Sequence, residues 1–204
     1  MKNLFLYLKF LSPTTNMVPV LSRDPAVFNS AVEDILEEVI HELESSAKEY
    51  SALGEDGISS VLVTGVNGRN GVRAFREMNS NGHVDITIKS TLRPTNQLLG
   101  EAKIYNGPRY HVEGMDQLLN RYTTGRFPYA FMVEYVRNTA VKTACQKIRD
   151  HLDEHRPFAQ LCDCKDHQIV WSFCSTHEHK SASKITVLHL SVHLPTDKKI
   201  EAKL

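Results

Sequence analysis

Apolar residues recur at helical spacing in the first part of the chain. Asp24-Pro25 is a typical helix start, because aspartate caps the first turn and proline is tolerated there. The apolar positions that follow predict one long amphipathic helix to about Tyr50, and they are Val32, Ile35, Leu36, Val39, Ile40 and Leu43. After the break at Leu53-Gly54, the segment EDGISSVLVTGV predicts a second, shorter helix with Glu55 near its start.

The period then changes from helical to alternating. Residues 67–82 are polar and glycine-rich, and we expect a loop there with a short strand around Val72 to Phe75. In HVDITIK, from His83 on, apolar and polar residues alternate, which predicts a half-buried strand with Asp85 on its polar face. A turn at LRPTNQ leads to LGEAKIY, a second predicted strand that places Glu101 and Lys103 on one face.

The second half of the chain adds two helices and three strands. Met115, Leu118, Leu119 and Tyr122 predict one helix, and the segment from Thr139 to Leu152 predicts another. Between them, YAFMVEYV is apolar almost throughout, as in a central strand covered on both faces. Two late runs, QIVWSF and KITVLHLSVHL, are expected to extend the sheet or to form a hairpin at its edge.

This order of elements predicts an α/β fold with a central mixed β-sheet flanked by helices. We expect a single domain over residues 1–204, with a core at about 24–152 and a C-terminal strand extension at about 165–195. The length of 204 residues and the 41% of hydrophobic residues allow one substantial core. The first residues, MKNLFLYLKFL, predict a buried strand or helix rather than a secretory leader, because Lys9 interrupts the apolar run.

Composition narrows the function classes. Lys plus Arg and Asp plus Glu both number 24, so the net charge is zero and a protein that simply coats nucleic acid is disfavoured. No run approaches the ~18 apolar residues of a membrane span. We therefore expect a cytoplasmic protein with no membrane contact. The four cysteines, Cys145, Cys162, Cys164 and Cys174, are expected to be reduced thiols.

Two carboxylates and a lysine on adjacent strands form the candidate site. Asp85 and Glu101 offer the oxygen ligands that Mg²⁺ prefers, and the carbonyl of Ala102 offers a third. Lys103, one residue further on, would favour the deprotonated form of an attacking water and offset the charge that builds on a phosphate. The pattern predicts a site for Mg²⁺, with Mn²⁺ as its substitute, that hydrolyses phosphodiesters.

The segments HVDITI, GEAKIY and DQLLNRY, with EDGIS upstream, resemble the PD-(D/E)XK nuclease superfamily, which includes restriction endonucleases and RecB-like nucleases. The resemblance covers about residues 55–136. It implies a restriction-endonuclease-like core and metal-dependent cleavage of DNA. It also implies that Asp85 and Glu101 are metal ligands and that Lys103 is catalytic. A glutamate on an earlier helix often completes such a site, which makes Glu55 the candidate and Glu42 and Asp56 the alternatives.

The departures from the family pattern concern the residues that would meet the substrate. RecB-like nucleases carry Q-x-x-x-Y on the helix after the core strand, and Gln117 matches the glutamine as a catalytic residue. Tyr122 lies one residue too far along, and Arg121 occupies the expected place of the tyrosine. Arg121, Tyr122 and Arg109 are the expected substrate contacts. The proline of the motif is replaced by Val84.

Alternative functions remain open at this point. One is a catalytically silent scaffold that binds nucleic acid or a protein partner. Another is a zinc-binding module, although its spacing is poor and buried thiols are the simpler interpretation; its ligands would be Cys162, Cys164, His167, Cys174, His177 and His179. For the nuclease, the expected partners are DNA, a second copy of the chain and a regulatory protein. A role as effector of bacterial anti-phage defence is an analogy with other small nucleases.

Overall fold

The structure, a computed structural model, describes residues 22, 24–79 and 83–196. The segment MKNLFLYLKFL lies outside these residues. Seven strands form one sheet in the order β1-β2-β3-β4-β7-β6-β5. The strands are β1 (Val72–Asn79), β2 (His83–Ser90), β3 (Gln97–Ile104), β4 (Tyr129–Val136), β5 (Lys165–Asp166), β6 (Ser172–Glu178) and β7 (Lys184–His193). The helices are α3 (Pro25–Ser45), α4 (Ala47–Tyr50), α5 (Glu55–Asn67), α6 (Pro108–Asp116), the π-helix η1 (Gln117–Tyr122) and α7 (Val141–His155).

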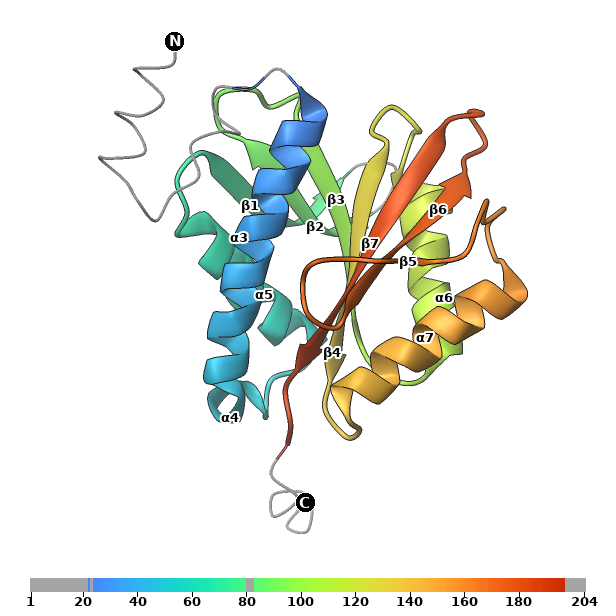
Figure 1. Cartoon of the computed structure of the whole chain (residues 1–204). Coiled ribbons are helices and arrows are strands. Elements are labelled where there is room, and N and C mark those ends of the chain that lie inside the picture. Colours follow the sequence, from blue (N-terminus) through green and yellow to red (C-terminus); the bar gives the residue numbers. More distant parts are fainter. Residues whose placement is uncertain (1–21, 23, 80–82, 197–204) are drawn as a thin grey trace.

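The sheet is mixed, as the order of elements predicted. Strand β2 runs antiparallel to both of its neighbours, β1 and β3, whereas β4 runs parallel to both β3 and β7. Strand β7, from the late segment KITVLHLSVHL, continues the sheet beyond β4 and also forms an antiparallel hairpin with β6, so both expectations for this part of the chain hold. Helices α3 and α5 lie against one face of the sheet, and α6 and α7 lie against the other (Figure 1). In the described ranges, none of the helices combines the length and apolarity that a bilayer crossing requires.

Each face of the sheet has its own hydrophobic core. The apolar sides of α3 and α5 pack on Ala102, Phe131 and Val133, all fully buried. On the opposite face, Met132 packs with apolar residues of α6, η1 and α7, among them Met115 and Leu118. Because neighbouring residues of a strand point to opposite faces, β4 must be apolar almost throughout.

Strand β1 is longer than predicted. The glycine-rich segment 67–82 was expected to be mostly loop, yet eight of its residues form β1, which pairs with β2 in a register from Val72↔Ser90 to Asn79↔His83. Val72 and Ala74 are buried while Arg73 is exposed, so the alternation is present but short. Tertiary pairing overrides the weak local signal here. The outer edge of β1 is closed at Ala74, whose N–H and C=O both bond to the side-chain amide of Asn67.

Three other boundaries differ from the sequence predictions. The long first helix ends at Ser45, and α4 continues after a break at Ser46. The helix predicted around Met115 starts at Pro108, where proline opens the first turn after Gly107. The run QIVWSF is mostly turn, and β6 starts only at Ser172, because Trp171 adopts a left-handed conformation with φ of 55°.

A chain of buried polar side chains crosses the α6 face of the sheet. Its members come from β4, α6, β7 and β6, and in order they are Glu134, His111, His189, Ser175 and His177. Consecutive polar atoms are 2.7–2.9 Å apart. At the far end, His177 Nδ1 lies 3.2 Å from the carbonyl of Pro157. Each of these five residues is at most 2% exposed to solvent. The polar atoms of this buried polar chain therefore have to hydrogen-bond to one another, because water does not reach them.

The carbonyl of Pro157 determines the direction of every bond in the buried polar chain. A carbonyl only accepts, so His177 Nδ1 donates to it and, in a neutral ring, Nε2 accepts from Ser175. Ser175 then accepts from His189, and His189 accepts from His111. One proton remains for the bond between His111 and Glu134. Burial, followed by the neighbouring imidazoles, lowers the pKa of His189 well below its ordinary value, consistent with a neutral ring there.

Candidate active site

The site forms where β2 and β3 separate. The antiparallel register between them runs from Lys89↔Gln97 to Ile86↔Gly100 and stops there. Beyond that point, Asp85 Oδ2 takes the place of a strand partner and accepts the N–H of Ala102 at 3.2 Å. The N–H and C=O of one strand residue point to the same side, so the Ala102 carbonyl also faces Asp85. This is the third oxygen that the sequence predicted.

Lys103 lies among three carboxylates. Its Nζ is 2.6 Å from Glu101 Oε1, 3.6 Å from Glu55 Oε1 and 3.8 Å from Asp85 Oδ2. Glu55 is the first residue of α5, and its other oxygen accepts the N–H of Ile104 at 2.9 Å. The structure therefore brings together all four residues from three separate elements, α5, β2 and β3.

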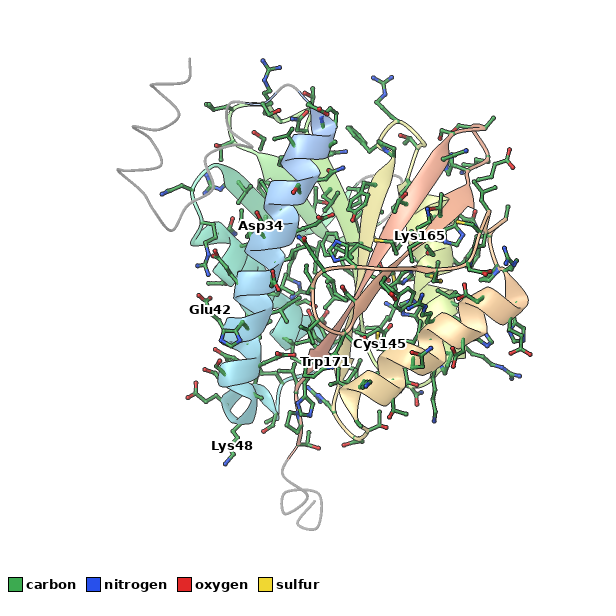
Figure 2. The ribbon with its side chains drawn as sticks, viewed as in Figure 1. Asp34, Glu42, Lys48, Cys145, Lys165 and Trp171 are labelled. Carbon is green, nitrogen blue, oxygen red and sulfur yellow. The ribbon has the colours of Figure 1, made fainter. Side chains whose placement is uncertain are left out.

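The alternatives to Glu55 lie elsewhere. Glu42 is on the outer side of α3 (Figure 2), where its Oε1 is 2.6 Å from Arg69. Asp56 is exposed and pairs with Arg76 at 2.7 Å. Only Glu55 reaches Lys103, because the start of α5 points at the end of β3.

Burial and charge set the protonation of the pair at the centre. Glu101 is fully buried, and this burial, together with the charge of Asp85, raises its pKa to about 8 even though Lys103 opposes the shift. For Lys103, burial favours the neutral amine, but the hydrogen bond and charge of Glu101, with Asp85 and Glu55, outweigh it and raise the pKa. Lys103 therefore stays an ammonium ion near neutral pH, while Glu101 readily holds a proton.

The residues fit a hard divalent cation held partly by water. Glu101 Oε2 is buried and has no hydrogen-bond partner among the described residues, so one carboxylate oxygen is unused. Within the same residues, no group of three or more His, Cys, Asp and Glu side chains could enclose a metal ion. Mg²⁺ does not need such a group, because it is commonly bound by one or two carboxylates and keeps several waters. Asp85, Glu101 and the Ala102 carbonyl meet that requirement, and Glu55, whose Oε1 lies 3.6 Å from the same Lys103 Nζ, stands beside them.

The raised pKa of Glu101 predicts that the metal-free protein loses stability as pH rises. In the unfolded chain the carboxyl is ionised above about pH 4.5, whereas the folded state keeps its proton until about pH 8. The folded state thus binds more protons in this window, and its free energy of unfolding falls as pH increases. Between pH 7 and 8 we expect a loss of about 1 kcal/mol in EDTA, measured by urea denaturation. The slope should vanish in Glu101→Gln, and a slope unchanged in that variant would contradict the assignment.

A π-helical turn sets the relative positions of Gln117, Arg121 and Tyr122. In η1 the N–H of Thr123 donates to the carbonyl of Leu118, five residues back, at 3.0 Å. Residues five apart on such a turn share a face, as residues four apart do on an α-helix. Gln117 and Tyr122 are five apart. On this turn Tyr122, rather than Arg121, is therefore the residue one turn along from Gln117.

Tyr122 and Arg121 have different surroundings. Tyr122 is buried, and its pKa is raised first by burial and then by the charges of Glu101 and Asp85. Arg121 is exposed and, with Gln117, lines a shallow depression of about 480 Å³ on the outside of η1. No hydrogen bond joins the Gln117 side chain to Glu101 or Lys103 in the described part of the chain.

The remaining predicted contacts are dispersed. Arg109 is exposed on the first turn of α6, beside α7, where it contributes to lowering the pKa of His151 after the larger effects of burial and His155. The structure does not bring Arg109 to the carboxylates. In the zinc interpretation, Cys164 and His177 are buried in separate hydrogen-bonded settings. Cys145, on α7 (Figure 2), is likewise free, as are the other three cysteines.

Sequence reasoning missed Gly114. It lies in α6 against the aliphatic part of Lys103, where a Cβ would stand 3.3 Å from Lys103 Cγ and Cε and 2.9 Å from Met132 Cε. Glycine inside a helix costs roughly 1 kcal/mol relative to alanine, so its presence in the helix was the signal of a close approach. The absent side chain lets α6 hold the lysine stem in place.

Comparison of the chain with protein-family models, with curated proteins and with solved structures found no match. The geometry of the site therefore carries the functional argument by itself.

Proposed function

We propose that this protein is a Mg²⁺-dependent nuclease of the PD-(D/E)XK type that hydrolyses DNA. The observation that carries the proposal is the position of the Lys103 ammonium within 4 Å of carboxylates from β2, β3 and α5. A surface hairpin with the same residue types would leave them solvated. Here Glu101 is completely buried, and burial of a carboxylate beside two others is costly without a task that uses it.

The order of elements supports a restriction-endonuclease-like core. Glu55 begins a helix, Asp85 and the Glu101–Lys103 pair follow on adjacent antiparallel strands, and Tyr122 follows on the next helix. Strand β4 then pairs parallel to β3. This is the sequence of parts that the resemblance to the PD-(D/E)XK superfamily implies.

Each residue has a distinct part in the proposed reaction. Asp85, Glu101 and the Ala102 carbonyl would hold Mg²⁺, which supplies Lewis-acid polarisation of the phosphate. Lys103 places a fixed positive charge beside the developing charge of the phosphorane. A water oxygen bonds to phosphorus, the bond to the leaving oxygen breaks, the water releases one proton to solvent and the leaving oxygen takes one up. Glu55 orients Lys103 through their ion pair.

The test is cleavage of supercoiled plasmid and of single-stranded DNA by the full chain with Mg²⁺, Mn²⁺ or EDTA. We expect cutting with either metal and none in EDTA. Asp85→Asn should abolish it, while Asp166→Asn, an exposed aspartate on β5, should leave it intact. No cutting of either substrate with either metal would overturn the proposal and favour a silent scaffold.

A further inference from the structure

A second cavity is lined in part by η1. It has a volume of about 250 Å³ and lies between η1, the turn after α7 and the β6–β7 hairpin. Its lining includes Leu119, Asn120, Phe158, His177, His179 and Lys180. Phe158 also borders the depression lined by Gln117 and Arg121, so the two hollows share one wall. His177 is the last member of the buried polar chain.

His179 offers this cavity an unused hydrogen-bond donor. Its Nδ1 accepts the N–H of Ser181 at 3.2 Å, so that nitrogen carries no proton in the neutral ring. The proton is then on Nε2, which is buried and has no partner among the described residues. The Nδ1 atom of the His179 ring faces Ser181 and Gly125. Nε2, on the opposite side of the ring, is therefore the atom available to the cavity. A buried donor without an acceptor is costly, and a ligand acceptor would satisfy it.

Lys180 adds a positive charge at the rim. Its Nζ donates to the carbonyl of Asn120 at 3.0 Å and so spans the cavity from the hairpin to η1. An ammonium has three donors, and no carboxylate lies within ion-pair distance of this one in the described part of the chain. Glu178 of β6 is exposed and also lines the cavity, but its carboxylate forms no ion pair with Lys180 among the described residues.

The third wall is apolar and strained. Phe158 and Ala159 both adopt left-handed conformations, with φ of 53° and 51°. Such conformations cost roughly 1 kcal/mol or more for residues other than glycine, and they cluster at binding sites. The strain places the Phe158 ring at the junction of the two hollows, where it forms a flat apolar surface. An aromatic ring so placed is a stacking platform for a planar base.

We propose that this cavity binds one nucleotide unit, with the phosphate at Lys180, an acceptor atom at His179 Nε2 and the base against Phe158. The volume is slightly below the roughly 300–1,000 Å³ of sites for drug-sized ligands, which suits a single unit. Leu119 and Asn120 of η1 line the cavity, and if the bound unit belongs to a DNA strand that the enzyme cuts, the proposal rests on the proposed function. A free nucleotide offers the same chemistry.

The test measures binding by the full chain in EDTA, where no cleavage occurs, by isothermal titration calorimetry. The probes are deoxyadenosine monophosphate, inorganic phosphate and a short single-stranded DNA. We expect the nucleotide, the DNA or both to bind and Lys180→Ala to weaken that binding at least tenfold. Lys184→Ala, an exposed lysine on the same hairpin, should change it less than twofold. Phe158→Leu should weaken nucleotide binding without affecting phosphate.

The outcomes separate the sources and the two proposals. Lys180-sensitive binding of DNA alone identifies a strand subsite, and binding of the mononucleotide alone identifies a free-nucleotide site; either supports the cavity. The cavity proposal is overturned if Lys180→Ala leaves the affinity unchanged, or if inorganic phosphate binds as tightly as the nucleotide. If plasmid is never cut while Lys180-sensitive binding persists, the nuclease proposal fails and the cavity stands. If plasmid is cut but Lys180→Ala leaves the binding affinity unchanged, the cavity proposal fails and the nuclease proposal stands.

Discussion

Replacing Lys103 by alanine is expected to lower the rate of DNA cleavage by roughly 10²–10³-fold, the usual loss when a fixed donor to transition-state charge is removed. The ammonium is the one cation that contacts Glu55, Asp85 and Glu101 among the described residues, so no neighbour can replace it. Steady-state cleavage of plasmid in Mg²⁺ measures the effect. Lys142→Ala, an exposed lysine on α7, is the matched control and should cut as the wild type does.

Folding must be separated from catalysis in this comparison. Without Lys103, the three carboxylates repel one another, and the variant is expected to unfold at a lower urea concentration. Glu55→Gln provides the second measurement, because it keeps the hydrogen bond to Ile104 and weakens only the ion pair with Lys103. A folded Lys103→Ala protein that cuts at the wild-type rate would show that the lysine has no catalytic part.

Replacing Glu134 by alanine is expected to lower the free energy of unfolding by about 3 kcal/mol, the usual cost of breaking a buried pair. Glu134 shares the last proton of the buried polar chain with His111 Nδ1 at 2.7 Å, and alanine leaves this buried nitrogen without a hydrogen-bond partner. Glu134→Gln is the control, because an amide can donate to a neutral His111 and the directions of the other bonds stay as they are. We expect it to cost less than about 1 kcal/mol.

Urea denaturation at pH 7.5 measures both Glu134 variants. At this pH His177 and His189, whose pKa values are lowered, are neutral in the folded state. The lowered pKa values of His177 and His189 mean that the folded state binds fewer protons than the unfolded chain below about pH 6.5, so stability is lost as pH falls through that value. Equal losses in Glu134→Ala and Glu134→Gln would show that the derived bond directions are wrong.

The local alternation of apolar and polar residues was enough to predict several strands and the faces on which the site residues lie. The alternation in HVDITI and the apolar run YAFMVEYV identified β2 and β4, because the half-buried and the fully buried strand have different patterns. The same alternation placed Asp85 on the polar face of β2, and the spacing of Glu101 and Lys103 placed both on one face of β3. Those inferences need only neighbours in sequence.

Contacts between distant segments were decided by the tertiary structure alone. Glu55 is joined to Lys103 and Ile104, 48 and 49 residues away, and a single sequence could not choose it over Glu42 or Asp56. The strand β1 forms because β2 pairs with it, although its own alternation is short. The π-helical turn of η1 could not be predicted from the spacing of its residues, and the buried polar chain joins residues from four elements. Packing selects among locally equivalent conformations, and so these features become visible only when the chain is folded.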